Sequence, residues 1–438
     1  MKRIFLFILI YLIILVNIGF CQNFSISNYL SGSGNLRIKE YIKVDDGYLL
    51  YIDFIGEIDY PSIITADIRD IVLVKYDNDF NLIWSKHIGG TGIDVASDIV
   101  IDNNLNIYIL GTFQETCSFD GLNELSSDGD YDVFLAKYSN NGNFIWSKKI
   151  AYNEAFQGVN SMDIEENNLI VAGYYSDSIN FFSDNFVSNY GMFYAKFDFN
   201  GNFIWAKNIP TTSSNTSLES VSVFSDGYYL NGRFRGTASF DLGDYTSNHS
   251  SYTDVFLYKT DFNGNGQWVR RSYGDGNAFT GTITQDNYGN IYYTGLFNGT
   301  GIEVDSTASL VSHNIVNNGN SDIFIFKYNK NGNLIWAYGY GKEGSDWARD
   351  ISFKNNFIYN TGYFSDTIIF DQDTLVSSTI SDRDAFIGVF DVLGNPLRAT
   401  KMEDSDDGNE SGMTLTIDSD NYIYWGGTFR STSVIVGD

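Results

Sequence analysis

Few side chains in this sequence belong to the types that carry out chemistry at a single site. The three histidines, His87, His249 and His313, stand in separate stretches of the chain. The sequence contains no HExxH, G-x-S-x-G, phosphate-loop or Cys/His metal motif. Each histidine is therefore expected to be a loop residue rather than a catalytic base. The pattern favours a non-catalytic protein over an enzyme.

Oxygen-bearing side chains are denser, and calcium is the one cofactor that they suggest. Residues 198–202 and 261–265 place Asp and Asn at alternate positions, as calcium loops do. The same residues are those that tight hairpin turns require, which is the competing interpretation. Asp404, Asp406 and Glu410 lie in a more acidic segment and are the predicted calcium ligands.

A third set of candidates is the pair Trp347 and Arg349, for ligand binding. They interrupt a stretch that elsewhere holds small residues, as in the matching residues 94–96. An aromatic ring beside a guanidinium group is a common element of binding surfaces. The competing interpretation is that Trp347 serves packing.

These candidates lie within a repeat of about 60 residues that alternates two motifs. The first resembles Asp-x-Phe-Leu-x-Lys-Tyr followed by a turn and a tryptophan. Its copies begin at Asp70, Asp132, Gly191, Asp254, Asp322 and Asp384, and their tryptophans are Trp84, Trp146, Trp205, Trp268 and Trp336, with Arg398 in the last copy. The second motif ends in Gly-x-aromatic, at Gly111, Gly173, Gly232, Gly295, Gly362 and Gly427, and residues 37–56 form a degenerate copy.

Each motif predicts two short strands joined by an Asn/Asp/Gly turn, such as Asn141-Gly142. Two hairpins per unit give a four-stranded sheet, and radial stacking of such sheets gives a β-propeller. We therefore predict an all-β propeller of six to seven four-stranded blades over residues 36–438; a β-solenoid is the rival fold. Strands A and B come from the second motif, and C and D from the first. The strand-D tryptophan should pack between blades, and the strand-B glycine should allow close backbone approach.

The repeat units at residues 105–111 and 289–295 resemble the SBBP type of bacterial β-propeller repeat. That repeat has an Asp-x-x-Gly-Asn-x-Tyr-x-x-Gly core. The resemblance implies an exported bacterial surface or secreted protein whose ligand is undefined. The repeat itself has seven A–B pairs but only six C–D pairs, so the seventh blade lacks its C–D hairpin. The sequence is thus expected to be a fragment, or to be completed by another strand or a partner.

The N-terminus has the order of a secretory signal peptide. Lys2 and Arg3 precede an apolar run over residues 4–16, and a boundary follows near Cys21. We predict a signal peptide at 1–21, an N-terminal segment at 22–35 and no transmembrane segment after cleavage. An uncleaved anchor and a lipoprotein are the alternatives. Cleavage would leave Cys117 without a partner for a disulfide.

The charge of the chain limits its partners. The formal net charge is -27 and the pI is about 4.3. Such a surface repels a phosphate backbone, so nucleic acid is excluded as a partner. The predicted partner is an unidentified protein or a glycan.

The variable connections of the repeat predict where binding occurs. The B–C and D–A connections are long, and both lie on one face because the strands are antiparallel. The leading hypothesis is a non-catalytic propeller, secreted or on the bacterial cell surface, that binds macromolecules or glycans through this face. The alternatives are a secreted carbohydrate-active lyase or hydrolase, and a structural module of a larger cell-surface protein.

Overall fold

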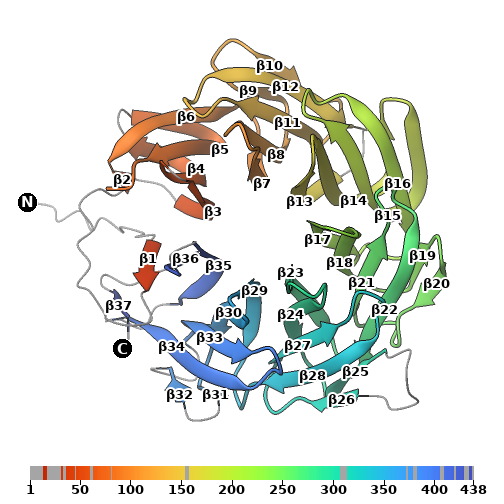
Figure 1. Ribbon diagram of the computed structural model, residues 1–438. Coiled ribbons are helices and arrows are strands. Elements are labelled where there is room, and N and C mark those ends of the chain that lie inside the picture. Colours follow the sequence, from red (N-terminus) through yellow and green to blue (C-terminus); the bar gives the residue numbers. More distant parts are fainter. Residues whose placement is uncertain are drawn as a thin grey trace, which may run out of the picture.

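The computed structural model is an all-β ring of antiparallel sheets around a central axis (Figure 1). It describes residues 13–16, 31–32, 36–44, 46–59, 63–79, 81–152, 157–305, 313–370, 373–377, 382–404, 409–418, 421–428 and 434–436. Within these residues, no helix is long and apolar enough to cross a membrane. The fold is a β-propeller, as the sequence predicted.

The first three blades are meanders in which strand A lies nearest the axis and strand D lies at the rim (Figure 1). Their strands are, in the order A to D, β3 (Leu36–Val44), β4 (Gly47–Asp59), β5 (Ile63–Tyr76) and β6 (Leu82–Gly90); β7 (Asp94–Ile101), β8 (Ile107–Phe113), β11 (Asp132–Tyr138) and β12 (Phe144–Ala151); β13 (Gln157–Glu165), β14 (Asn168–Phe181), β15 (Asp184–Asp198) and β16 (Phe203–Thr211).

Three further blades repeat this order, and a strand pair β35–β36 follows them. Their strands are β17 (Ser217–Phe224), β18 (Gly227–Phe234), β21 (Asp254–Thr260) and β22 (Gly266–Gly274); β23 (Ala278–Gln285), β24 (Ile291–Phe297), β27 (Asp322–Tyr328) and β28 (Leu334–Tyr340); β29 (Trp347–Lys354), β30 (Phe357–Phe364), β33 (Asp384–Asp391) and β34 (Pro396–Asp404); and finally β35 (Ser411–Ile417) and β36 (Ile423–Thr428).

The A strands are joined to one another around the axis by side-chain-to-backbone hydrogen bonds. The Asp98 carboxylate accepts from Met162 N–H at 2.6 Å, and Asp350 accepts from Leu415 N–H at 2.7 Å. In each complete blade from β7 onward, strand A also carries a register shift near its start. Such bulges re-aim side chains, so the beginning of each A strand can present residues at the axial end of the ring.

The long B–C connections are mostly hairpins that pair with the rim of the preceding blade. Their strands are β9 (Thr116–Ser118) and β10 (Glu124–Ser126), β19 (Thr237–Phe240) and β20 (Gly243–Thr246), β25 (Gly301–Val304) and β26 (His313–Val316), and β31 (Thr367–Phe370) and β32 (Asp373–Val376). β9 pairs with β6, β19 with β16, and β25 with β22. The late strand β37 (Val434–Val436) pairs with β34 in the same way. These hairpins cover strand edges that would otherwise be exposed.

The recurrent tryptophan of strand D packs between blades, which confirms the prediction. Each ring lies against the positive-φ glycine in the C–D turn of the next blade, and a Cβ built on Gly332 would stand 2.7 Å from the Trp268 ring. The indole N–H of Trp268 also donates to Lys330 O at 3.1 Å. The five contacts are Trp84 on Gly142, Trp146 on Gly201, Trp205 on Gly264, Trp268 on Gly332 and Trp336 on Gly394.

The strand-B glycine also behaves as predicted. A Cβ on Gly362 would stand 1.8 Å from Trp347 O, and one on Gly295 would stand 2.1 Å from Phe279 O. Strands A and B approach too closely there for any side chain. The glycine is therefore required by sterics rather than by a turn conformation.

The tryptophan contact is missing where the seventh blade meets its neighbours. The sixth blade has the exposed Arg398 at the tryptophan position. Blade 7 instead packs on blade 1 through Tyr424 and Tyr48, whose ring centroids lie 5.7 Å apart. The tryptophan is thus replaced at this end of the repeat.

Two parts of the predicted N-terminus take part in strand pairing. β1 (Ile13–Val16) pairs antiparallel with β36, on the edge where strand C of a complete blade lies. β2 (Ser31–Gly32) pairs with β4. The remainder of the predicted signal peptide at 1–21 and of segment 22–35 lies outside the described residues, and the signal peptide stays a prediction.

Candidate functional site

Aromatic rings and guanidinium groups gather at the axial end of blades 4 to 6, where A strands begin and B strands end. Trp347 is the first residue of β29 and pairs with Tyr363 of β30, near the end of that strand. Phe279 occupies the matching position of β23 in the preceding blade. The ring centroid of Trp347 lies 6.2 Å from that of Phe279 and 6.0 Å from that of Tyr363. The strand register therefore builds a three-ring cluster from two blades.

Three arginines lie over these rings. The guanidinium of Arg349 lies 3.8 Å from the Trp347 centroid, and that of Arg383 lies 4.4 Å from the Tyr363 centroid. Arg233 lies 4.8 Å from the Phe279 centroid. We call Arg233, Phe279, Trp347, Arg349, Tyr363 and Arg383 the axial cluster. Guanidinium groups stacked in this way are pre-oriented for planar acceptors such as carboxylates.

The arginines of the axial cluster differ in their partners. Arg233 Nη1 lies 3.4 Å from Glu219 Oε1. Among the described residues, Arg349 and Arg383 have no carboxylate oxygen within 4 Å, and the Arg349 Nε donates to Ser411 Oγ at 3.1 Å. Burial lowers the pKa of Arg349, and the charge of Arg383 lowers it further. An anion between these two groups would relieve that repulsion.

The structure places the predicted pair Trp347 and Arg349 together, half-buried, on the predicted face. Phe279, Tyr363 and Arg383 were missed by the sequence reasoning. The signal that could have found Phe279 is its position in the repeat, which is that of Trp347. Arg383 immediately precedes a strand-C aspartate, as Arg69 does in the first blade.

The expectation that the face of the B–C and D–A connections forms the binding surface stays a prediction. The described hairpins β9–β10, β19–β20 and β25–β26 are paired with the neighbouring blade at the rim (Figure 1). Their backbone groups are used in sheet formation, so they are not free recognition loops. The candidate surface is confined to the ends of the strands near the axis.

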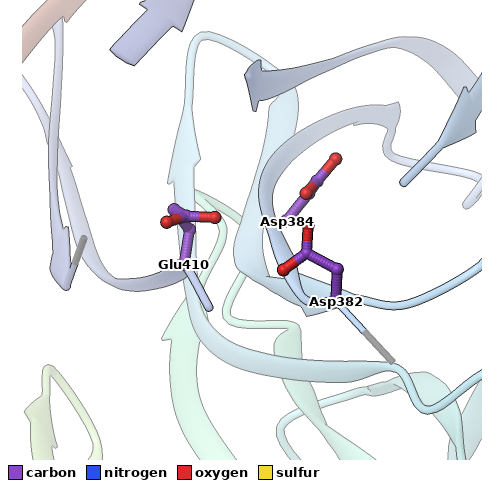
Figure 2. A group of neighbouring side chains, drawn as sticks. All are labelled: Asp382, Asp384 and Glu410. Atoms are coloured by element: carbon purple, nitrogen blue, oxygen red, sulfur yellow. The ribbon is translucent and has the colours of Figure 1, made fainter. Parts of the chain in front are cut away.

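Three buried carboxylates form a second candidate set beside the axial cluster. One oxygen of each of Asp382, Asp384 and Glu410 lies within 4.8 Å of the others, and all three residues are buried. Figure 2 shows Glu410 on one segment, with Asp382 and Asp384 on the segment facing it. Lys401 Nζ lies 2.9 Å from Asp384 Oδ2 and so compensates one charge. Oxygen donors of this kind suit a hard cation such as calcium.

The predicted calcium ligands are only partly brought together by the structure. Glu410 lies with Asp382 and Asp384 rather than in a loop site of its own. Asp404 is the last residue of β34, where only its backbone is described, and Asp406 lies outside the described residues. Asp384 could have been found from the sequence, because it is the repeated first aspartate of strand C.

The turn aspartates at 198 and 261 are hydrogen-bonded within their own turns. Asp198 Oδ1 accepts from the N–H groups of Asn200 and Asn202, each at 2.8 Å. Asp261 accepts equivalently from its own turn at 2.9 and 2.8 Å. These contacts hold the pKa of both carboxyls below the ordinary value, although burial opposes them. The structure therefore favours the hairpin interpretation of these turns.

The histidines and the cysteine are dispersed. The expectation that each histidine is a loop residue is wrong for His87 in β6 and His313 in β26, and holds for His249. His87 Nε2 lies 2.6 Å from Asp70 Oδ2, and His249 Nδ1 accepts from Ser251 N–H at 3.2 Å. Only the backbone of His313 is described. Cys117 is a buried free thiol in β9, and burial raises its pKa well above the usual value. Such a thiol is a poor nucleophile.

Comparisons with known proteins agree with the repeat architecture. No family model matches the chain. A protein of Acanthamoeba polyphaga mimivirus, named as an uncharacterized WD repeat-containing protein, is 24% identical over 448 residues, which is 85% of this chain and 32% of that protein. The chain thus spans about a third of that relative. A solved WD40 β-propeller domain of Doa1 covers 78% of this chain and 94% of its own at a TM-score of 0.29 and 11% identity.

The mimivirus relative shows likeness to a WD-repeat protein. The comparisons do not show the SBBP type or a bacterial origin, so both remain predictions. The class that the structure itself defines is the β-propeller, with strand A innermost and a hairpin from each of several blades added to the preceding one.

Proposed function

We propose that this chain is a non-catalytic β-propeller interaction module that binds an acidic segment of a protein partner through the axial cluster. The observation that carries this proposal is the pair Arg349 and Arg383. Both guanidinium groups lie over aromatic rings, and neither has a carboxylate partner in the described part of the chain.

The composition makes this pair unusual. Asp and Glu number 54 against 27 Lys and Arg, so an arginine would ordinarily find a carboxylate nearby. Among the described residues, Arg349 and Arg383 have no carboxylate within 4 Å, although the buried Asp382, Asp384 and Glu410 lie beside the axial cluster. Charge-assisted hydrogen bonds to a carboxylate contribute about 1.5–3 kcal/mol each, enough for useful affinity from a short acidic segment.

The geometry favours a protein ligand over a glycan. A sugar ring stacks on a free aromatic face, whereas the guanidinium of Arg349 already lies 3.8 Å from the Trp347 centroid. Tyr363 is 6% exposed and is covered by Arg383. The axial cluster therefore offers more positive charge than free aromatic surface for stacking.

The proposal includes secretion or display on a bacterial surface, because the N-terminal sequence has the pattern of a signal peptide.

The test is fluorescence anisotropy of a labelled hexaglutamate peptide titrated with the full chain. Arg383→Ala and Arg349→Ala should each weaken binding about tenfold or more, which corresponds to about 1.4 kcal/mol. Arg398→Ala is the matched control, because this exposed arginine of the same blade lies on strand D, away from the axis. It should leave the affinity unchanged.

Hexaglutamine and oligogalacturonate complete the experiment. Hexaglutamine should not bind, because it lacks the charge. Equal affinity for hexaglutamate in all three variants, or no saturable binding at all, would refute the proposal. Tighter binding of oligogalacturonate than of hexaglutamate would replace the protein ligand with an acidic glycan.

A further inference from the structure

In most blades strand C carries a buried aspartate at the start of its Asp-x-Phe-Leu motif, and a basic residue on strand D lies within 4 Å of that carboxylate. In the first, second, fourth and sixth blades, the basic residue lies opposite the residue two places after the aspartate. The aspartates are 2% exposed or less. The pairs are His87 with Asp70 at 2.6 Å, Lys149 with Asp132 at 3.2 Å, Arg271 with Asp254 at 3.6 Å and Lys401 with Asp384 at 2.9 Å.

Two blades depart from this rule in different ways. In the third blade both charges are absent, since Gly191 replaces the aspartate and Asn208 stands at the basic position. In the fifth blade Asp322 remains, while Gly339 stands opposite Phe324 where the base should be. Asp322 has no basic side chain within 4 Å among the described residues. Its charge is therefore not compensated as in the other blades.

A second carboxylate adds to the charge at this junction. Asp346, just before β29 of the sixth blade, is 0% exposed, as is Asp322. Asp322 Oδ1 and Asp346 Oδ2 lie 2.4 and 2.7 Å from the point where a Cβ of Gly341 would stand. One point can thus be close to both carboxylates, and glycine leaves that space open.

The two groups are incompletely hydrogen-bonded. The Oδ2 of Asp322 accepts from Asn318 N–H at 2.8 Å, and that of Asp346 accepts from Lys342 N–H at 3.3 Å. The Oδ1 atoms of both residues are buried without a hydrogen-bond partner. Burial and the charge of Asp322 raise the pKa of Asp346 to about 8. Two buried carboxylates with free oxygens call for a cation, because an uncompensated buried charge is costly.

We propose that Asp322 and Asp346 bind one divalent cation, calcium, between the fifth and sixth blades. Calcium takes carboxylate oxygens at 2.3–2.6 Å, and its charge of +2 balances the two carboxylates. The ion takes the place of the basic strand-D side chain of the other blades, since the fifth blade has Gly339 at that position. It joins strand C of one blade to strand A of the next, so it should stabilise this junction.

The other junctions provide internal controls. Asp94 stands in blade 2 where Asp346 stands in blade 6, but its partner Asp70 has His87. The corresponding residue of the fifth blade is Ala278, buried beside the Asp254–Arg271 pair. An alanine at the position of Asp346 is therefore already tolerated elsewhere in this fold.

The test measures bound calcium and thermal stability of the full chain after EDTA treatment and dialysis. Wild-type protein should bind calcium and show a higher melting temperature in 2 mM calcium chloride than in EDTA. Asp346→Ala and the near-isosteric Asp346→Asn should lose one equivalent of calcium and most of this increase. Asp94→Ala should keep both. Two substitutions of Asp346 are used, so that the test can still be made if one variant folds poorly.

Glu410→Gln is the parallel variant, because its carboxylate cluster is the competing calcium site. If calcium stabilisation survives in Asp346→Asn and disappears in Glu410→Gln, the assignment to Asp322 and Asp346 is wrong. If wild-type protein binds no calcium and its melting temperature does not respond, the pair holds a proton instead, and the proposal is overturned.

Discussion

Replacement of Trp268 by alanine tests whether the tryptophan-on-glycine contact holds neighbouring blades together. Trp268 is 8% exposed, and its ring lies against Gly332 in the turn of the next blade. Its indole N–H donates to Lys330 O at 3.1 Å, and Arg270 lies 5.3 Å from the ring centroid. The substitution therefore removes a packed ring and a hydrogen bond from one junction only.

The expected magnitude follows from these contacts. Deletion of a buried tryptophan side chain costs about 3–5 kcal/mol, because the cavity collapses only in part. Loss of the indole donor leaves Lys330 O with one partner fewer, which adds about 1 kcal/mol. We expect a total loss of about 4–6 kcal/mol in the free energy of unfolding.

The assay is urea denaturation followed by circular dichroism and tyrosine–tryptophan fluorescence. Arg398→Ala is the matched control, since it alters the equivalent strand-D position of the sixth blade, where the residue is exposed. It should change stability by less than about 0.5 kcal/mol. The reasoning is refuted if Trp268→Ala shifts the denaturation midpoint no more than Arg398→Ala does.

Three further predictions concern other parts of the chain. Burial and the neighbouring Asp70 raise the pKa of Asp94 to about 8. Ionisation of this group should therefore lower the stability of the fold as the pH rises from about 4 to about 8. Asp94→Ala should show a shallower decline in melting temperature over that range. Gly362→Ala should cost about 1–3 kcal/mol in the free energy of unfolding, because the new Cβ would stand 1.8 Å from Trp347 O; an unchanged melting temperature would show that strands A and B separate easily. Mass spectrometry of the exported protein should find an N-terminus near Gln22, and an intact Met1 would contradict the signal-peptide prediction.

The architecture was predictable because each repeat contains the short-range sequence signals that determine its strands and turns. Asn-Gly turns set the hairpins, the strand-D tryptophan marks the junctions, and the strand-B glycine marks the closest backbone approach. These are short-range signals that recur in register. The loss of the tryptophan at Arg398 was also visible in the sequence.

The site was less predictable because it depends on contacts between blades. Trp347 and Arg349 stood out from their neighbours in the sequence. Tyr363 reaches them because β30 pairs with β29, and Arg383 reaches them because its guanidinium lies over the Tyr363 ring. Glu410 was grouped with residues close to it in sequence, whereas the fold places it beside Asp382 and Asp384.

The pairing of the long B–C connections was unpredictable for a related reason. Their variable length is typical of recognition loops, yet β9, β19 and β25 each pair with the rim strand of the preceding blade. Sequence alone does not show which edge a short strand will join. The candidate residues Trp347 and Arg349 lie instead in β29, directly after a D–A connection.

Photo-crosslinking tests the central claim most directly, because it locates the bound ligand on the propeller. A hexaglutamate peptide with a terminal benzophenone would be irradiated with the full chain, and the crosslinked residues would be identified by mass spectrometry. The account predicts crosslinks within peptides that contain Trp347, Arg349 or Arg383, which are lost on competition with unlabelled peptide. Crosslinks confined to the rim hairpins β9–β10, β19–β20 or β25–β26 would contradict it.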